Sequence, residues 1–95
     1  MNLIPIVLPI DLLSRSFLLP GGAQTEVDRI IEADQLLQKG AQQYEANQFQ
    51  DALESFEQAL KIYKETGSYS QQIVALSNIG VTYRRLSRYS KALQA

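Results

Sequence analysis

The side chains of this chain that could do acid–base chemistry are carboxylates, because the sequence contains no cysteine and no histidine. Glu54 and Glu57 lie one helical turn apart, and glycoside-cleaving enzymes use such carboxylate pairs. No base accompanies the two residues, so a solvated helix face is the favoured interpretation. The missing residue types also exclude disulfides, thiolate nucleophiles, zinc–thiolate sites and imidazole bases. We therefore predict no catalytic residue, no metal site and no cofactor, and we expect that the chain is not an enzyme.

Arginines and tyrosines form a second group that could bind a ligand. Arg84, Arg85 and Arg88 are the only basic cluster. They could hold an acidic peptide, or they could form a cationic helix end beside the helix dipole, which is the favoured interpretation. The tyrosines could stack on nucleic-acid bases, but the net charge of −1 provides no field that attracts a polyanion. We predict core packing for them and no nucleic-acid partner. These tyrosines are Tyr44, Tyr63, Tyr83 and Tyr89.

Residues 1–23 differ in character from the rest, because they are apolar and contain all three prolines. The prolines, Asp11 and Arg15 interrupt the apolar run, so we predict no stable membrane span. Gly21, Gly22 and Ala23 would suit a signal-peptide cleavage site, although the basic start is missing. The segment is interpreted as an apolar leader packed on the helices or as a degenerate signal. A cytoplasmic location is expected, or a secreted or periplasmic one if residues 1–23 act as a signal peptide.

Helical periodicity begins at Thr25, which is a predicted N-cap with Asp28 three residues later. Asn47 is predicted to terminate the first helix in the left-handed conformation, and Gly67 to end the second. Ser68 or Ser70 would cap a third helix, and a fourth is expected to begin around Tyr89, Ala92 and Leu93. The positions expected to face the core are Val27, Ile30, Ile31, Ala33, Leu37, Gly40, Ala41 and Tyr44, then Ala52, Leu53, Phe56, Ala59, Leu60 and Tyr63, then Ile73, Leu76, Ile79, Gly80, Tyr83 and Leu86.

The chain repeats itself at a spacing of 40 residues, the distance along the sequence from Gly40 to Gly80. The same shift pairs Leu36 with Leu76, Phe49 with Tyr89, Ala52 with Ala92, and Leu53 with Leu93. A glycine inside a helix costs about 1 kcal/mol relative to alanine, so its recurrence indicates a close approach of two helices. The repeat therefore predicts equivalent packing of two helix pairs.

This pattern resembles the tetratricopeptide repeat. The first repeat matches through Leu36, Gly40, Ala52, Phe56 and Ala59, and the second through Leu76, Ile79, Gly80, Tyr83, Tyr89 and Ala92. Lys39 and Gln43 depart from the leucine and the aromatic residue that the family prefers, and the spacing exceeds the usual period of about 34 residues. The chain looks like a long-period bacterial-type variant of about 40 residues per repeat.

The resemblance implies an all-α fold in which antiparallel helix pairs stack as a short right-handed α-solenoid of about one and a half repeats. The repeat region would span residues 24–95, with repeat 1 at about 33–66 and a truncated repeat 2 at about 73–95. One side of the last helices should remain apolar and uncovered, because solenoids usually need about three repeats. The chain could be the front end of a longer array, which is the favoured explanation, or a homodimer or a partner could cover it.

The resemblance also implies a protein–protein interaction adaptor, inside a larger scaffold or regulatory protein, whose partner is a protein or a peptide. The alternative is a self-associating structural module that dimerises through its exposed repeat face. Family partners commonly bind in the groove formed by the first helix of each pair. A lysine–asparagine carboxylate clamp is not supported, and a hydrophobic peptide or a helix fits better. The positions that the resemblance places in this groove are Asp34, Leu37, Ala41, Ser77, Val81 and Arg84.

Overall fold

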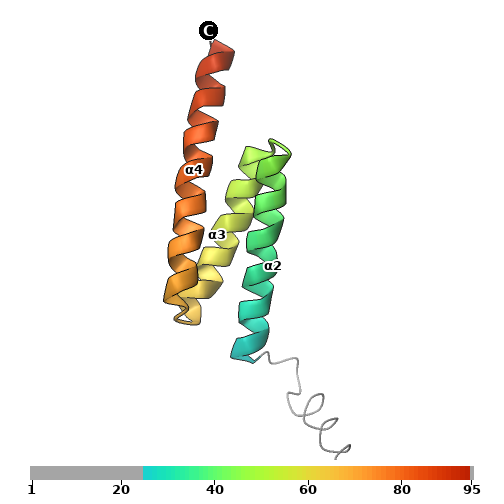
Figure 1. Ribbon diagram of the computed structural model, residues 1–95, viewed down its shortest axis with the longest axis vertical. Helices are drawn as coiled ribbons and strands as arrows, with labels where there is room; N and C mark the ends of the chain where they lie inside the picture. Colours follow the sequence, from blue (N-terminus) through green and yellow to red (C-terminus); the bar gives the residue numbers. More distant parts are fainter. Residues whose placement is uncertain (1–24, 95) are drawn as a thin grey trace, which may run out of the picture.

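Three helices form the part of the protein that the computed structural model describes, residues 25–94. Helix α2 spans Glu26–Glu45, α3 spans Phe49–Glu65 and α4 spans Tyr69–Gln94. Each helix runs antiparallel to the one before it, and α3 lies between α2 and α4 (Figure 1). This arrangement confirms the predicted all-α fold of stacked helix pairs. The predictions for residues 1–23 lie outside the described residues.

Local side-chain and backbone signals set both ends of α2. The Asp28 N–H donates to Thr25 Oγ1 at 3.0 Å, which confirms Thr25 as the N-cap. At the other end Asn47 adopts a φ of 63°, as predicted, and the Gln48 N–H donates to the Gln43 carbonyl at 2.8 Å. A left-handed residue followed by this long hydrogen bond is the Schellman motif. The chain is thereby turned back so that α3 can pack along α2.

The same motif closes the turn between α3 and α4. Gly67 has a φ of 68°, and the Ser68 N–H donates to the Tyr63 carbonyl at 2.9 Å. The Ser68 carbonyl accepts from the Gln72 N–H at 3.0 Å, while the Ser68 hydroxyl hydrogen-bonds with that of Thr66 at 2.8 Å. Gly67 therefore ends α3 as predicted, and α4 starts directly after Ser68.

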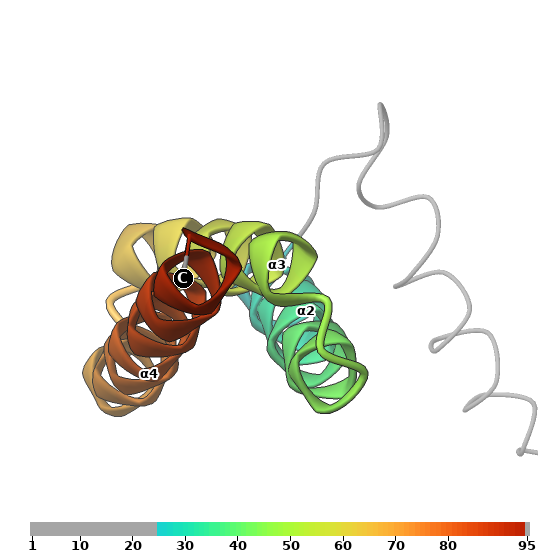
Figure 2. The ribbon, with the colours of Figure 1, turned by 90° about the horizontal axis from the view of Figure 1, so that it is seen from above.

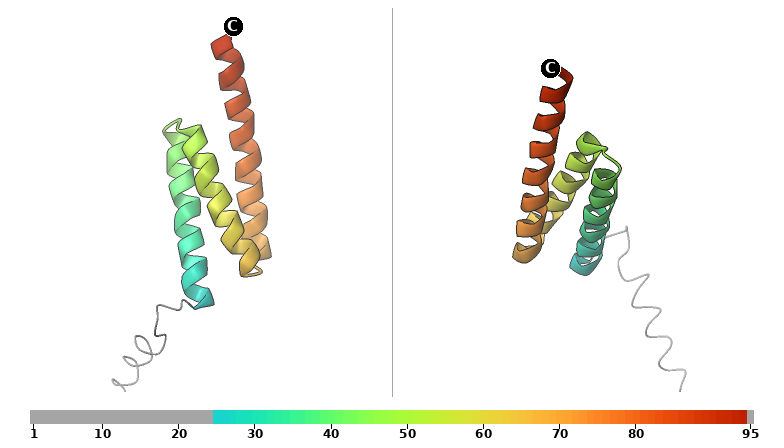
Figure 3. Two further views of the ribbon diagram at one scale, coloured as in Figure 1. Left: turned by 180° about the vertical axis from the view of Figure 1, so that it is seen from behind. Right: turned by 45° about the horizontal axis from the view of Figure 1, so that its top comes forward.

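The prediction of a fourth helix is wrong, because α4 continues without a break through Tyr89 and Ala92 to Gln94. Figure 3 shows this single helix extending past the α2–α3 turn. Ser87 occupies the position that is equivalent to Asn47 by the 40-residue shift. Serine has no particular tolerance for the left-handed conformation that a terminator needs, whereas asparagine visits it readily. Good helix formers such as Arg88, Lys91 and Leu93 then keep the helix going.

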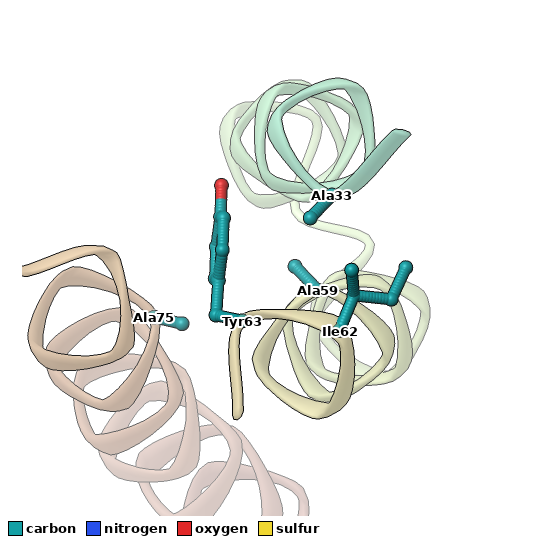
Figure 4. Close-up of a cluster of buried hydrophobic side chains, with 5 residues drawn as sticks. All are labelled: Ala33, Ala59, Ile62, Tyr63 and Ala75. Atoms are coloured by element: carbon teal, nitrogen blue, oxygen red, sulfur yellow. The ribbon is translucent and has the colours of Figure 1, made fainter. Parts of the chain in front are cut away.

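All three helices contribute to one buried cluster, in which small residues surround the Tyr63 ring. Ala33 of α2, Ala59, Ile62 and Tyr63 of α3, and Ala75 of α4 form one buried cluster (Figure 4). The alanines let the helices approach closely, and the fully buried Tyr63 ring fills the space between α2 and α4. Helix α3 is consequently the most buried of the three and holds the other two in place.

Helices α2 and α3 are in close contact at Gly40. A Cβ atom added to Gly40 would lie 2.6 Å from Phe56 Cε1, and the Phe56 side chain is only 2% exposed. At Gly80, the equivalent position of α4, an added Cβ would have no atom within 4 Å. The first glycine of the repeat therefore makes room for a packed helix, whereas the space beside Gly80 is not filled by any of residues 25–94.

The structure corrects the predicted core face of α4. Ile73, Leu76 and Tyr83 were expected to pack in the core, but they are 66%, 51% and 53% exposed. Ala75 and Thr82, both 0% exposed, form the side that packs on α3. The Thr82 hydroxyl is satisfied because it donates to the Asn78 carbonyl at 2.7 Å. Apolar residues occur on several sides of α4, so periodicity alone could not identify the side that contacts α3.

Other residues that were expected in the core also lie at the surface. Val27 and Ile31 of α2 are exposed, and so is Ala41. Tyr89 is exposed too, although its ring meets that of Phe49 edge-on at 6.3 Å. Tyrosine core packing is thus confirmed for Tyr63 and wrong for Tyr83 and Tyr89, while Tyr44 is half-buried. Val27 and Ile31 are exposed because none of the described helices packs against the side of α2 on which they lie.

Candidate interaction groove

The three helices together form a trough. Seen from above, α2 and α4 diverge as two walls, and α3 spans the back between them (Figure 2). This geometry arises because α3 packs against both neighbours, whereas α2 and α4 barely touch each other. The open side of the trough is therefore lined by residues of α2 and α4 that α3 does not cover.

A cavity of about 200 Å³ lies in this trough. Phe56 contributes the aromatic surface of α3, and the walls alternate between apolar and polar side chains. The lining residues are Ala41, Tyr44, Glu45, Phe56, Asn78 and Val81. Small side chains in the two walls leave this space open, because Ala41 and Val81 do not fill the distance between the diverging helices.

The structure brings together part of the predicted groove. Ala41 and Val81 line the same cavity from opposite walls, as the sequence interpretation places them. Leu37 is half-buried and packs against the core cluster, so little of it faces the trough. Ser77 and Arg84 are exposed on α4 outside the cavity lining. Only a ligand that extends beyond the cavity would reach these two.

Asp34, the remaining predicted groove residue, forms a hydrogen bond within the fold. Its carboxylate accepts a hydrogen bond from the Tyr63 hydroxyl at 2.5 Å, which connects α2 to α3. Burial raises the pKa of Tyr63 well above its usual value, and the hydrogen bond to Asp34 and the negative charge of that carboxylate raise it further. All three causes favour the neutral phenol, so Tyr63 keeps its proton in the folded state.

We expect that this phenol makes the fold less stable at high pH. Because the Tyr63 pKa is raised in the folded state, its stabilising contribution is complete below the unfolded pKa of about 10 and decreases as pH rises above it, by at most about 1.4 kcal/mol per pH unit. Urea midpoints at about pH 8 and pH 11 should therefore differ more in the native chain than in Tyr63→Phe. Equal pH dependence in the two proteins would contradict this assignment.

Arg85 joins the helices at one end of the trough. Its guanidinium carbon lies 4.9 Å from the centre of the Phe49 ring and 5.5 Å from that of Tyr44, and its Nη1 donates to the Tyr44 hydroxyl at 3.4 Å. The helix-dipole interpretation of the arginine cluster is wrong for Arg84, Arg85 and Arg88. Because α4 continues to Gln94, all three lie outside its last turn, where that effect acts and where Lys91 is the basic residue.

Sequence reasoning missed Glu45 and Asn78 as groove residues. Both line the cavity. Helical spacing carried a signal for them, since Glu45 follows Ala41 by four positions and Asn78 precedes Val81 by three, which places each pair on one helix face. Tyr44 and Phe56 were predicted only as core residues. That they also line the cavity depends on how far α2 and α4 diverge, which the sequence does not show.

Other surface hollows of residues 25–94 are more open than the trough cavity, including one of about 270 Å³ lined by Asn47, Phe49, Arg85, Arg88, Tyr89 and Ala92. Glu54 and Glu57 are both exposed on α3. Within residues 25–94, no group of three or more acidic side chains is arranged to hold a metal ion. In the same region, none of the helices has the length and apolar character needed to cross a membrane. The trough cavity is the more enclosed of these hollows and lies where the predicted groove residues Ala41 and Val81 meet.

Comparison with known proteins agrees with the helical geometry. No curated protein and no solved structure matches the chain. The family profile described as tetratricopeptide repeat matches residues 28–95, which include nearly all of the three helices. The match covers well over half of the sequence. The chain therefore belongs to the tetratricopeptide-repeat family.

Proposed function

We propose that this chain is a protein–protein interaction adaptor that binds a peptide or a helix in the trough between α2 and α4. Tetratricopeptide repeats are typically non-catalytic interaction domains, and membership of that family supports the general class. The observation that carries the specific site is the cavity in which Ala41, Val81 and Phe56 adjoin the polar side chains of Glu45 and Asn78.

The size and lining of the cavity define the chemistry of the ligand. A space of about 200 Å³ is smaller than the roughly 300–1,000 Å³ of small-molecule pockets, and it suits one large apolar side chain of a peptide. The Asn78 amide can both donate to and accept from a peptide backbone. Glu45 disfavours an acidic neighbour. We therefore expect an apolar anchor residue next to neutral or basic residues.

The test uses the full chain and peptides that are selected on it from a random library. In Val81→Arg, the long side chain fills the cavity from α4, and affinity for the selected peptides should decrease at least about tenfold. Ser70→Arg adds the same side chain at an exposed position of α4 outside the lining, and affinity should change less than about twofold. Equal affinities of the native chain and Val81→Arg would place the binding site elsewhere.

Two variants outside the cavity measure how far the ligand extends. Ser77→Ala and Arg84→Ala should weaken binding only if the ligand continues along α4 beyond the cavity, since both residues are exposed there.

The exposed apolar side of α4 also supports a role inside a larger scaffold or regulatory protein. The same side supports the alternative of self-association, and light-scattering mass of the full chain distinguishes the two.

A further inference from the structure

Positive charge gathers in the C-terminal half of α4. Arg84, Arg85, Arg88 and Lys91 lie there, and the helix contains no acidic residue, whereas acidic residues outnumber basic ones on α2 and on α3. The three arginines lie before the last turn of α4, so the helix dipole does not account for them. The other interpretation that the sequence allows for them is an acidic ligand.

Two of these arginines line one hollow, which we call the arginine hollow. It has a volume of about 270 Å³ and is lined by Asn47, Phe49, Arg85, Arg88, Tyr89 and Ala92. The hollow lies where α4 passes the turn between α2 and α3, because Asn47 belongs to that turn and Phe49 begins α3. It shares no lining residue with the trough cavity, so the two are separate sites.

Contacts within the fold hold the Arg85 side chain in place. Its guanidinium carbon lies over the Phe49 ring, 4.9 Å from the centre, and Nη1 donates to the Tyr44 hydroxyl. Phe49 is itself only 5% exposed, and its ring meets that of Tyr44 edge-on at 5.2 Å. A guanidinium that the fold already positions loses little conformational entropy when it binds a ligand.

The fold leaves both arginines of the hollow without an opposite charge. Within residues 25–94 the ion pairs are formed by Arg29, and no carboxylate of this region pairs with Arg85 or Arg88. The Nε and Nη2 groups of Arg85 donate no hydrogen bond to these residues, although the side chain is half-buried. Neighbouring guanidinium N–H groups of this kind donate two parallel hydrogen bonds to a carboxylate. The hollow therefore offers positive charge and donors that suit an anion.

We propose that the arginine hollow binds an acidic segment of a partner protein that carries two carboxylate side chains spaced by one residue. Arg85 and Arg88 are three positions apart on α4, which places their Cβ atoms roughly 5–6 Å apart on one helix face. In an extended peptide, side chains i and i+2 point to the same side and lie about 6.5 Å apart. One carboxylate therefore faces each guanidinium, and the Asn47 amide supplies a further donor.

A nucleic acid fits this surface less well. Phe49 is buried and already covered by Arg85, so among the ring-bearing side chains of the hollow only Tyr89 is exposed enough to stack on a base. A polynucleotide would also extend past the two arginines, toward Glu45 and Asp51 on either side of the α2–α3 turn, which would repel its phosphates. A short acidic segment avoids that repulsion.

A second copy of this chain is also a poor source of the segment. Within residues 25–94, the acidic residues that are spaced by one position are Glu26 with Asp28 and Glu32 with Asp34, and both pairs lie in α2. Residues i and i+2 of a helix do not face the same side, so neither pair can present two carboxylates to the hollow. The spacing therefore favours an extended segment of a different protein.

The experiment titrates the isotope-labelled full chain with a synthetic peptide, acetyl-Gly-Glu-Ser-Glu-Gly-amide. Pairing near the surface is weak and screened by salt, so the buffer contains about 20 mM NaCl and the peptide reaches about 10 mM. We expect progressive shifts of the Asn47, Arg85 and Arg88 signals, including the Nε–H signals of the two arginines. The same peptide with glutamine in place of both glutamates should cause no shift, because it keeps the shape and loses the charge.

Three variants locate the binding. Arg88→Gln should weaken it at least about fivefold, because one of two charge-assisted pairs is lost, and an unchanged circular dichroism spectrum would show that this exposed position leaves the fold intact. Arg85→Gln should weaken it at least as much, although it also removes the contact with the Phe49 ring. Lys91→Gln is the matched control, because it removes the same charge from α4 outside the lining, and affinity should change less than about twofold.

Several results would overturn the proposal. One is the absence of any shift at the highest peptide concentration, and another is an equal response to the glutamine peptide. A loss of affinity in Lys91→Gln as large as that in Arg88→Gln would reveal unspecific attraction, and shifts confined to Ala41 and Val81 would place the peptide in the trough. A single-stranded oligouridylate that binds at Arg85 and Arg88 at least about tenfold more tightly than the peptide would assign the hollow to nucleic acid instead.

Discussion

Replacing Gly40 by alanine should lower the free energy of unfolding by about 2 kcal/mol, although alanine is the better helix former. The added methyl group would lie 2.6 and 2.7 Å from two carbons of the Phe56 ring. That ring is 2% exposed and is a rigid side chain, so it can relieve the contact only by shifting toward the trough cavity or by pushing α2 away. Overpacking of this kind typically costs 1–3 kcal/mol even after the surroundings adjust.

Gly80→Ala is the matched control for this substitution. It makes the same chemical change at the equivalent repeat position, where no atom lies within 4 Å of the added carbon. We expect a gain of about 0.5–1 kcal/mol, because alanine restricts the unfolded chain and favours helix. Urea unfolding of both variants measures the difference. Equal effects of the two substitutions would mean that Gly40 is not a contact between helices.

A double variant tests whether the Phe56 ring causes the loss. Phe56→Leu leaves an apolar side chain but removes part of the ring that meets Gly40. The cost of Gly40→Ala should therefore be smaller in the Phe56→Leu background than in the native chain, by at least about 0.5 kcal/mol. Additive costs would show that the methyl group clashes with something else or that α2 is disturbed in another way.

Replacing Phe56 by alanine should lower the free energy of unfolding by about 3–5 kcal/mol, the cost of removing a large buried aromatic side chain. The side chain fills the space beside Gly40 and also forms the aromatic surface of the trough cavity, so its removal leaves a void between α2 and α3. A folded unit of about 70 residues has roughly 4–10 kcal/mol of total stability, so this loss would consume most of it. Thermal unfolding followed by circular dichroism should show a broad transition at a low temperature, or no transition.

Tyr83→Ala provides the comparison for that truncation. Tyr83 is an aromatic residue of similar size on α4, but it is 53% exposed. Its loss should change the stability of the isolated chain by less than about 1 kcal/mol. A cost for Tyr83→Ala as large as that for Phe56→Ala would mean that the Tyr83 side of α4 is covered in solution.

The sequence predicted the helix ends well wherever a local signal sets them. Thr25 caps α2 with its own hydroxyl, and Asn47 and Gly67 supply the two left-handed residues of the turns. These predictions succeed because a cap or a Schellman turn involves neighbours within about six residues. The prediction of a fourth helix failed because no local signal ends α4 at that point. Ser87 is not a helix terminator, and α4 continues through it.

The candidate groove was only partly predictable. Ala41 and Val81 do line one cavity, and the 40-residue repeat placed them on equivalent helices. That Asp34 accepts a hydrogen bond from the buried Tyr63 could not be read from spacing, because the two residues lie on different helices, 29 positions apart. The roles of Glu45 and Asn78 likewise depend on how α2 and α4 diverge.

By itself, then, the sequence determined the helical class, the turns and the repeated glycine, since these depend on residue type and short-range spacing. The tertiary structure decided which side of each helix is buried. Ala75 and Thr82 of α4 pack on α3, whereas Leu76 and Tyr83 remain exposed. Gly40 meets a ring and Gly80 meets none, although the two residues are equivalent in the repeat. The physical reason is that burial depends on the neighbouring helix that is present, and a periodic pattern describes only the helix that carries it.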